Sequence, residues 1–365
     1  MKICFLSSAR SAHTVKWSTW FAERGHEVHV ISFSRGEIPG VQVHYIDAGL
    51  NCRDGDGKKL KYLLQGGRVK RLLAAIRPDV VNAHYATSYG TVAALAGQSN
   101  HVVSVWGADV YTFPQKSPLH KLLLKFSLSR AGYLFSTSQV MAREAGKYTS
   151  KPFSITPFGV NMTLFSPDKR TRERDEDVFW VGTVKTLTAK YGIDYLLRAA
   201  ALLRQQHPEI PLRLRIAGKG DQEEAYRALA SQLGLDDVID WLGFISQDRA
   251  AVEWANMDVG VIYSTVDSES FGVSAVEAQA CGIPVIISDV PGLMEATSPG
   301  NTSLVVERRQ EQKLAQALYI LYQDKALRMR MGQEGRSFVQ THYEINHCFE
   351  AVERIFEQIT SENKA

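Results

Sequence analysis

Two carboxylates, Glu269 and Glu277, flank the point at which a helix is expected to begin. Gly272 suits a tight turn before that helix, so the backbone N–H groups of Phe271, Gly272 and Val273 would have no partners within it. A helix start of this kind is a natural site for a phosphate. The acids would repel a phosphate, but they suit hydroxyl groups on either side of it. A nucleoside diphosphate sugar has this layout of ribose diol, diphosphate and sugar hydroxyls.

Two lysines, Lys185 and Lys190, follow an apolar strand pattern that ends near Gly182 and Thr183. Ligands of open α/β sheets bind beyond the carboxyl ends of the strands. Lysines at that place could stabilise a diphosphate as it leaves. One well-placed hydrogen-bond donor typically lowers the free energy of such a transition state by about 3–4 kcal/mol. We therefore expect both lysines to act in catalysis; two surface lysines in a loop are the alternative.

Further contacts with the nucleotide sugar, which is the sugar donor, are expected after two other strand patterns. Gly218 and Gly220 follow one of them, and Gly243 and Phe244 follow the other. Glycine allows a ligand to approach the backbone closely, which makes a nucleotide contact plausible at these loops. Gly182 and Thr183, at the end of the strand before the lysines, and Ser270, beside the first glutamate, complete the residues expected to bind the nucleotide sugar.

The first half of the chain carries polar and aromatic residues at its strand ends. Arg10 and His13 follow the first strand pattern, and His84 and Tyr85 lie at the end of the fourth. We place these four residues on the acceptor side, with Arg10 near a diphosphate. A solvated loop is the alternative for Arg10, and a structural or exposed histidine is the alternative for the other two.

Strand and helix patterns alternate along nearly the whole chain. Several strands, such as those with Val80-Val81 and Val102-Val103, are apolar on both faces, as a covered parallel sheet requires. This order predicts doubly wound α/β sheets. A chain of 365 residues is also too long for one core, so two domains are expected. The segment from Asn161 to Asp177, with Pro167 and a run of charges, predicts the linker between them.

Composition points to a cytoplasmic protein. No apolar run approaches the ~18 residues of a membrane-spanning helix, and no secretory signal is recognised at the N-terminus. The cysteines Cys4, Cys52, Cys281 and Cys348 have no metal-like spacing, so we expect no metal and no cofactor beyond the donor.

Charge is distributed unevenly between the two halves. Residues 1–158 contain 20 Lys and Arg against 9 Asp and Glu, whereas the remainder contains 22 against 30. Basic clusters lie at Lys58–Lys61, Arg68–Arg71 and Lys116–Arg130, the last interleaved with leucines. This pattern favours contact of the first half with an anionic membrane surface, with a solvated helix face as the alternative for any one cluster. Nucleic acid is not expected as a partner.

The segment from Glu269 to Val285 resembles the E-x7-E signature of the family 4 retaining glycosyltransferases, with Phe-Gly after the first Glu and Gly-x-Pro-Val after the second. Lys190 matches the family lysine, whereas the family arginine falls on Thr183 and the family histidine on Trp106, at the end of another strand pattern. The resemblance therefore implies that the backbone carbonyl of Trp106 faces the reacting sugar and that Asp109 orients a hydroxyl or Arg10, so both are assigned to the catalytic group. The resemblance implies a GT-B fold with two Rossmann-like domains facing a cleft. It implies an acceptor domain over residues 1–158, a donor domain over 159–345, and a last helix, 346–365, that crosses back to the first domain.

The resemblance implies transfer of a hexosyl or N-acetylhexosaminyl group, with retention, from a UDP- or GDP-sugar to a glycan or a lipid-pyrophosphate-linked acceptor. We expect a role in cell-surface polysaccharide synthesis, in the cytoplasm or peripherally on the inner face of the membrane. Two alternatives are a nucleotide-sugar 2-epimerase, which needs no acceptor, and a two-domain sugar-binding receptor. Sugar, base, acceptor and linkage are left open.

Overall fold

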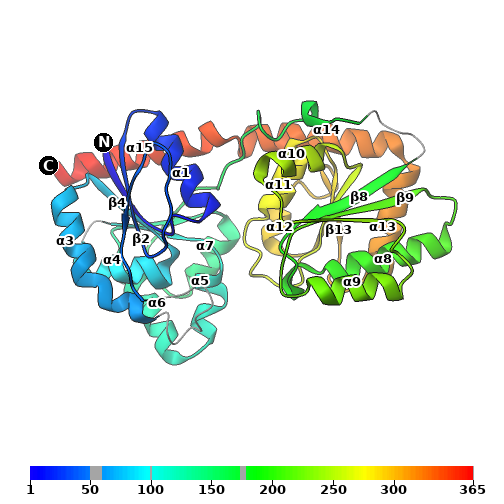
Figure 1. The fold of residues 1–365 in the computed structure, drawn as a ribbon. Coiled ribbons are helices and arrows are strands. Elements are labelled where there is room, and N and C mark those ends of the chain that lie inside the picture. Colours follow the sequence, from blue (N-terminus) through cyan, green and yellow to red (C-terminus); the bar gives the residue numbers. More distant parts are fainter. Residues whose placement is uncertain (50–59, 99–100, 173–177, 365) are drawn as a thin grey trace. The chain divides into compact units, whose positions relative to one another are not determined.

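The computed structural model describes residues 1–49, 60–98, 101–172 and 178–364. The chain forms two compact units: unit 1 is Met1–Phe158 with Cys348–Ala365, and unit 2 is Gly159–His347 (Figure 1). Each unit has a parallel sheet with helices on both faces, so the predicted pair of doubly wound α/β domains is confirmed. The last helix, α15 (Ile345–Lys364), begins in unit 2 and continues into unit 1.

Unit 1 has a seven-stranded sheet in the order β3-β2-β1-β4-β5-β6-β7. Its order reverses between β1 and β4, which makes the carboxyl ends of these two strands the place where a ligand is expected. The strands are β1 (Lys2–Leu6), β2 (Glu27–Ser32), β3 (Gln42–Tyr45), β4 (Val80–His84), β5 (Val102–Val105), β6 (Tyr133–Ser136) and β7 (Phe153–Ile155).

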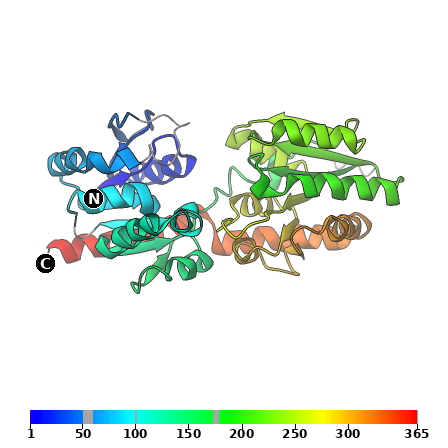
Figure 2. The same ribbon diagram turned by 90° about the horizontal axis from the view of Figure 1, so that it is seen from below.

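Helices bury both faces of this sheet. On one face, Leu6 of β1 shares a core with Leu73 of α3 and Leu128 of α6. On the other face, Phe5 packs against Phe21 of α1 and Phe356 of α15, so the two chain ends lie near one another in Figures 1 and 2. The helical segments are α1 (Ala12–Glu23), η1 (Leu60–Gln65), α3 (Gly66–Ile76), η2 (Tyr85–Gly90), α4 (Thr91–Leu95), α5 (Ala108–Tyr111), η3 (Phe113–Gln115), α6 (Pro118–Arg130) and α7 (Gln139–Ala145).

Unit 2 has a six-stranded sheet in the order β10-β9-β8-β11-β12-β13. All of its pairings are parallel, so the loops after the central strands β8, β9 and β11 emerge at one edge. The strands are β8 (Phe179–Val184), β9 (Leu212–Ala217), β10 (Ile239–Gly243), β11 (Val259–Ile262), β12 (Val285–Ser288) and β13 (Ser303–Val306).

The helices of unit 2 also divide between the two faces. Leu196 of α8 and Leu318 of α13 pack on Leu214 of β9 in the main core, while α10 and α11 lie on the opposite side of the strands in Figure 1. The helical segments are η4 (Pro167–Lys169), η5 (Ala189–Tyr191), α8 (Ile193–Gln206), α9 (Glu223–Gln232), α10 (Gln247–Ala255), α11 (Val273–Ala280), α12 (Pro291–Glu295), α13 (Glu311–Gln323) and α14 (Lys325–His342).

The predicted linker is largely part of unit 2. Arg170 donates hydrogen bonds to the carbonyl groups of Ala255 and Met257, at 2.8 and 3.0 Å. Asn256 binds the backbone N–H groups of Thr171 and Arg172. These contacts attach residues 170–172 to the end of α10, so the prediction of a linker is wrong for that part; residues 173–177 lie outside the described ranges.

Candidate functional site

A pocket of about 300 Å³ lies at the carboxyl ends of β8 and β9, beside the starts of α10 and α11. Five of the predicted site residues line it: Lys185, Gly218, Phe244, Val273 and Glu277. The sequence did not predict the other lining residues, which are Val184, Thr186, Tyr191, Ala217, Lys219, Ile245, Ser246, Gln247, Ala250 and Ser274. Their signal was their position, because most lie within a few residues of a predicted one.

Lys185 and Glu269 form a buried ion pair beside this pocket. Nζ lies 3.2 Å from Oε2, and the two side chains are 11% and 9% exposed. Burial alone would lower the pKa of Lys185, but nearby Glu269, Tyr191 and Glu277 raise it above its ordinary value. Burial alone would likewise raise the pKa of Glu269, but the adjacent lysines and the Gly272 N–H hold it below its ordinary value. Both groups are therefore charged at neutral pH.

Lys190 joins the same cluster. Its Nζ donates a hydrogen bond of 2.8 Å to the Ser268 carbonyl. The ammonium groups of Lys185 and Lys190 lie 4.5 and 5.2 Å from the centre of the Tyr191 ring. Burial lowers the pKa of Lys190; Glu269 opposes this shift and Lys185 adds to it. The fold thus gathers both predicted lysines and the first predicted glutamate around one aromatic ring.

The start of α11 differs from the prediction in one respect. Gly272, with a φ of +73°, is the N-cap, and the helix begins at Val273. The Gly272 N–H donates to Glu269 Oε1 at 3.1 Å, so this amide is bound within the chain and is not bare. Ser270 and Phe271 are buried, at 6% and 4% exposure, and lie away from the pocket lining. A phosphate at this helix would meet the amides from Val273 onward.

The predicted glycines allow close packing of the protein's own backbone. A Cβ atom at Gly218 would collide with the carbonyl of Lys185, and one at Gly220 with the carbonyl of Leu187. At Gly182 it would collide with the carbonyl of Arg215 on the neighbouring strand. Close packing of the loops after β8 and β9 therefore explains Gly218 and Gly220, and close packing of the two strands explains Gly182. Of the three, only Gly218 lines the pocket.

The other predicted donor residues lie in contrasting surroundings. Thr183 stands at the position of the family arginine. It is 1% exposed and lies within the sheet. Gly243 ends β10 with a φ of +64°. Phe244, next to it, is 80% exposed at the pocket. An aromatic side chain so exposed beside a pocket offers a flat surface to a ring.

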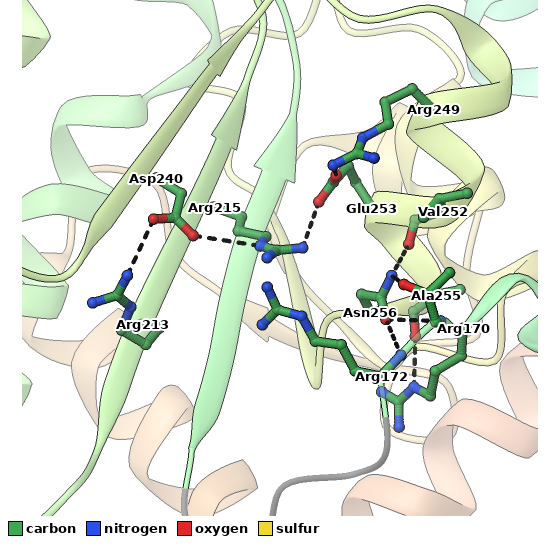
Figure 3. Close-up of polar contacts among 11 residues, drawn as sticks. Arg170, Arg172, Arg213, Arg215, Asp240, Arg249, Val252, Glu253, Ala255 and Asn256 are labelled. Carbon is green, nitrogen blue, oxygen red and sulfur yellow. Dashed lines mark hydrogen bonds and ion pairs between the residues drawn. The ribbon is translucent and has the colours of Figure 1, made fainter.

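A polar network holds α10 against the sheet, as Figure 3 shows. Arg215 of β9 lies 2.6 Å from Glu253 of α10 and 3.7 Å from Asp240 of β10. Arg249 reaches the second carboxylate oxygen of Glu253, which has no exposed surface. Because Gln247, in the first turn of α10, lines the pocket, this network positions one of its walls.

In unit 1, Asp109 joins the loops that follow β4 and β5. Its Oδ2 accepts the Ala86 N–H at 3.0 Å, and its Oδ1 accepts those of Trp106 and Gly107 at 3.2 and 2.9 Å. The carboxylate is 1% exposed, so it binds backbone in place of the hydroxyl or Arg10 that was expected. Arg10 Nε instead donates a hydrogen bond of 2.9 Å to the backbone carbonyl of Arg35.

His84 is a core residue and not a residue at a loop mouth. It is fully buried, its Nδ1 lies 3.1 Å from Ser7 Oγ, and burial, with a smaller effect of His13, lowers its pKa to about 3. His13 stacks on Phe158 with ring centroids 3.9 Å apart. Its ring also lies 5.7 Å from Trp106. A neutral, enclosed His84 is not placed to exchange protons with a substrate.

Tyr85, another predicted acceptor residue, reaches the surface. It is 38% exposed and has a φ of +71°, which is rare for a bulky residue. Such strained backbone often lies at functional sites. The assignment of Arg10, His13 and Tyr85 to the acceptor stays a prediction.

Within the described ranges, no three His, Cys, Asp or Glu side chains are grouped as metal ligands. The described helices also include none long and apolar enough to cross a membrane. Cys4, Cys281 and Cys348 are buried free thiols.

Comparison with known proteins identifies the family. Residues 166–338 match the model of glycosyl transferases group 1, and residues 2–138 match that of the glycosyl transferase 4-like proteins. A D-inositol 3-phosphate glycosyltransferase of Pseudarthrobacter chlorophenolicus is 32% identical over 351 residues, covering 86% of this chain and 81% of the relative. The chain is a family 4 glycosyltransferase. As such an enzyme, it transfers a sugar from a nucleotide sugar.

Two other proteins similar to this glycosyltransferase are informative. The putative glycosyltransferase EpsD of Bacillus subtilis is 26% identical over 336 residues, covering 87% of this chain and 85% of EpsD. Anabaena HepE, solved in complex with UDP and glucose, superposes with a TM-score of 0.80 at 19% identity, over 98% of this chain and all of HepE. The expected GT-B fold of this glycosyltransferase is therefore confirmed.

Proposed function

We propose that the diphosphate of a UDP- or GDP-sugar binds between Lys185 and the first turn of α11. The buried Lys185–Glu269 pair carries this proposal, because it fixes a cation at the pocket beside a helix start. Glu277, on the pocket wall, is placed to hold the ribose diol, and Glu269 is the acid proposed for the sugar hydroxyls. Between the two bases, HepE bound to UDP favours uracil.

We further propose that transfer retains the anomeric configuration. The bond between the sugar C1 and the diphosphate oxygen breaks, and Lys185 and Lys190 offset the charge that develops on that oxygen. The acceptor hydroxyl attacks C1 from the same face and gives its proton to the departing phosphate oxygen. Electrostatic stabilisation of this kind is commonly the largest catalytic contribution.

For the acceptor, we propose a glycan or a lipid-pyrophosphate-linked sugar used in cell-surface polysaccharide assembly, on the cytoplasmic face. The excess of basic over acidic residues in residues 1–158 supports an anionic acceptor.

A second candidate acceptor is a phosphorylated inositol, which the name of the P. chlorophenolicus relative favours. It would suit the same basic half of the chain. Incubation of the enzyme and UDP-glucose with either D-inositol 3-phosphate or a lipid-pyrophosphate sugar separates the two, because only the correct acceptor accelerates UDP release and forms a product.

The donor roles are tested with Glu277→Ala and Lys190→Ala, beside the control Lys313→Ala on an exposed ion pair of unit 2. We expect each site variant to lose at least tenfold in transfer, since one well-placed donor is typically worth about 10²–10³ in kcat. Activity near wild type in both would reject these roles. NMR of the product tests retention, and an inverted anomeric centre would reject the front-face step.

A further inference from the structure

Helix α6 presents an apolar stripe to the solvent. Its inner face is buried in the core of unit 1 through Leu124, Ser127 and Leu128. On its outer face, Leu119 and Leu122 are 56% and 63% exposed. Leucines exposed to this degree, next to each other at a spacing of three residues, are costly in water unless another apolar phase covers them.

The same face is strongly basic. The sequence from Lys116 to Arg130 contains four Lys and Arg residues and no Asp or Glu. Lys121 and Lys125, one turn apart, are exposed beside the two leucines. The guanidinium of Arg130 lies 5.6 Å from the centre of the Phe126 ring, at the end of the helix. Leucines and lysines therefore share one surface, which we call the α6 face (Leu119, Lys121, Leu122 and Lys125).

Two further leucines of unit 1 are exposed. Leu95, at the end of α4, is 47% exposed, and Leu64 of η1 is 80% exposed. A Cβ atom at Gly66, at the start of α3, would lie only 3.2 Å from the Cβ of Leu95, so α3 and α4 meet there. Helix α4 also contacts η1 and packs against α6, as Figure 1 shows. Exposed leucines therefore occur on α6, on α4 beside it, and on η1, which contacts α4.

We propose that the α6 face docks unit 1 on the surface of an anionic bilayer. A basic helix with exposed leucines fits the boundary between headgroups and acyl chains, where the leucines insert and the lysines meet lipid phosphates. A second copy of this chain suits the face less well, because pairing would bring two sets of lysines together. This inference extends the proposed function, since a lipid-borne acceptor would then be met at the membrane surface.

The test is vesicle flotation of the full-length enzyme. The vesicles contain phosphatidylcholine either alone or mixed with phosphatidylglycerol, at low and at high salt. We expect binding only to the anionic vesicles, and loss of that binding at high salt because screening shortens the range of the lysine charges. Equal binding to both kinds of vesicle, or none to the anionic ones, would overturn the proposal.

Two double variants separate the contributions of charge and of apolar insertion. Lys121→Gln/Lys125→Gln should weaken anionic binding about 30-fold, since each lysine near the surface contributes about fivefold. Leu119→Gln/Leu122→Gln should weaken it by at least tenfold. Matched controls are Lys313→Gln and Ile320→Gln, which change exposed residues of unit 2 and should bind as wild type does.

Two further readouts keep the outcomes distinct. Thermal unfolding of the variants should match wild type, and release of UDP from UDP-glucose in solution should persist. Unchanged binding by both double variants would reject the α6 face as the docking surface. A wild-type dimer that dissociates in the leucine variant, by sedimentation, would show that a second copy covers the face instead. If wild-type enzyme turns over UDP-glucose but does not bind anionic vesicles, this inference alone is rejected. If it binds the vesicles but shows no turnover, the proposed function is rejected.

Discussion

Lys185 and Glu269 illustrate how single residues of this enzyme depend on one another. Each is buried, and each keeps its charge because the other lies 3.2 Å away. Removing one partner of a buried pair leaves an uncompensated charge, typically at a cost of about 3–5 kcal/mol. Loss of activity in a variant of either residue therefore has to be separated from loss of folding.

At the same scale, His84 predicts a pH dependence of stability. Its pKa is about 3 in the folded chain, mainly because of burial, against 6.5 when exposed. Between these values the unfolded chain binds the extra proton, so the stability that the neutral ring provides is complete above pH 6.5 and is lost towards pH 3. We expect the free energy of unfolding to fall by roughly 2–3 kcal/mol from pH 6.5 to pH 4 on this account.

Denaturant unfolding at several pH values measures this effect, with His84→Asn as the comparison. The variant should show a shallower decline over the same range, although it is less stable at neutral pH. Parallel pH profiles for the two proteins would show that His84 does not titrate as described.

At the scale of elements, α10 depends on charges that the strands supply. Arg215→Met should destabilise unit 2 by about 3–5 kcal/mol, because Glu253 would stay buried with only Arg249 beside it. The double variant Arg215→Met/Glu253→Met should recover much of that loss, since apolar residues often replace buried ion pairs at little cost.

Chemical denaturation of both variants checks this coupling, together with UDP binding. UDP affinity should fall in the single variant, because α10 forms a wall of the pocket. If the double variant is less stable than the single one, the network does not act as the geometry indicates.

At the scale of the whole molecule, each unit has its own sheet and its own core. A ligand of the unit 2 pocket should therefore stabilise unit 2 before it affects unit 1. At a hundred times its dissociation constant, UDP should add ~2.7 kcal/mol to the stability of the unit it binds. For a unit of 189 residues (Gly159–His347) this corresponds to a rise of about 5–10 °C in Tm.

Calorimetry with and without UDP measures the shift. Hydrogen exchange shows which unit carries it, and we expect stronger protection in β8, β9 and the start of α11. If UDP increased protection only in unit 1, the nucleotide would bind unit 1, and the predicted site in unit 2 would be contradicted.

The sequence by itself determined the fold class and most elements, because both depend on local patterns. Apolar runs such as Val102–Val105 predict covered strands, and Glu269 and Glu277 lie within one short segment, so their spacing can be recognised without the fold. It did not predict β13 or the short helix α12, since their four or five residues contain too little periodicity.

Only the tertiary structure decided which polar groups the protein itself satisfies. Whether the Gly272 amide is bare and whether Asp109 meets a hydroxyl depend on which side chains and amides pair in the folded chain. Whether His84 reaches solvent depends on burial. The sequence suggested that Gly218 and Gly220 leave space for a ligand. In the structure, carbonyl groups of a neighbouring loop occupy the space beside both glycines. The physical reason is that the periodicity of a strand or helix is visible in a few neighbouring residues. Burial and hydrogen-bond partners, by contrast, arise only when the chain packs into its tertiary structure.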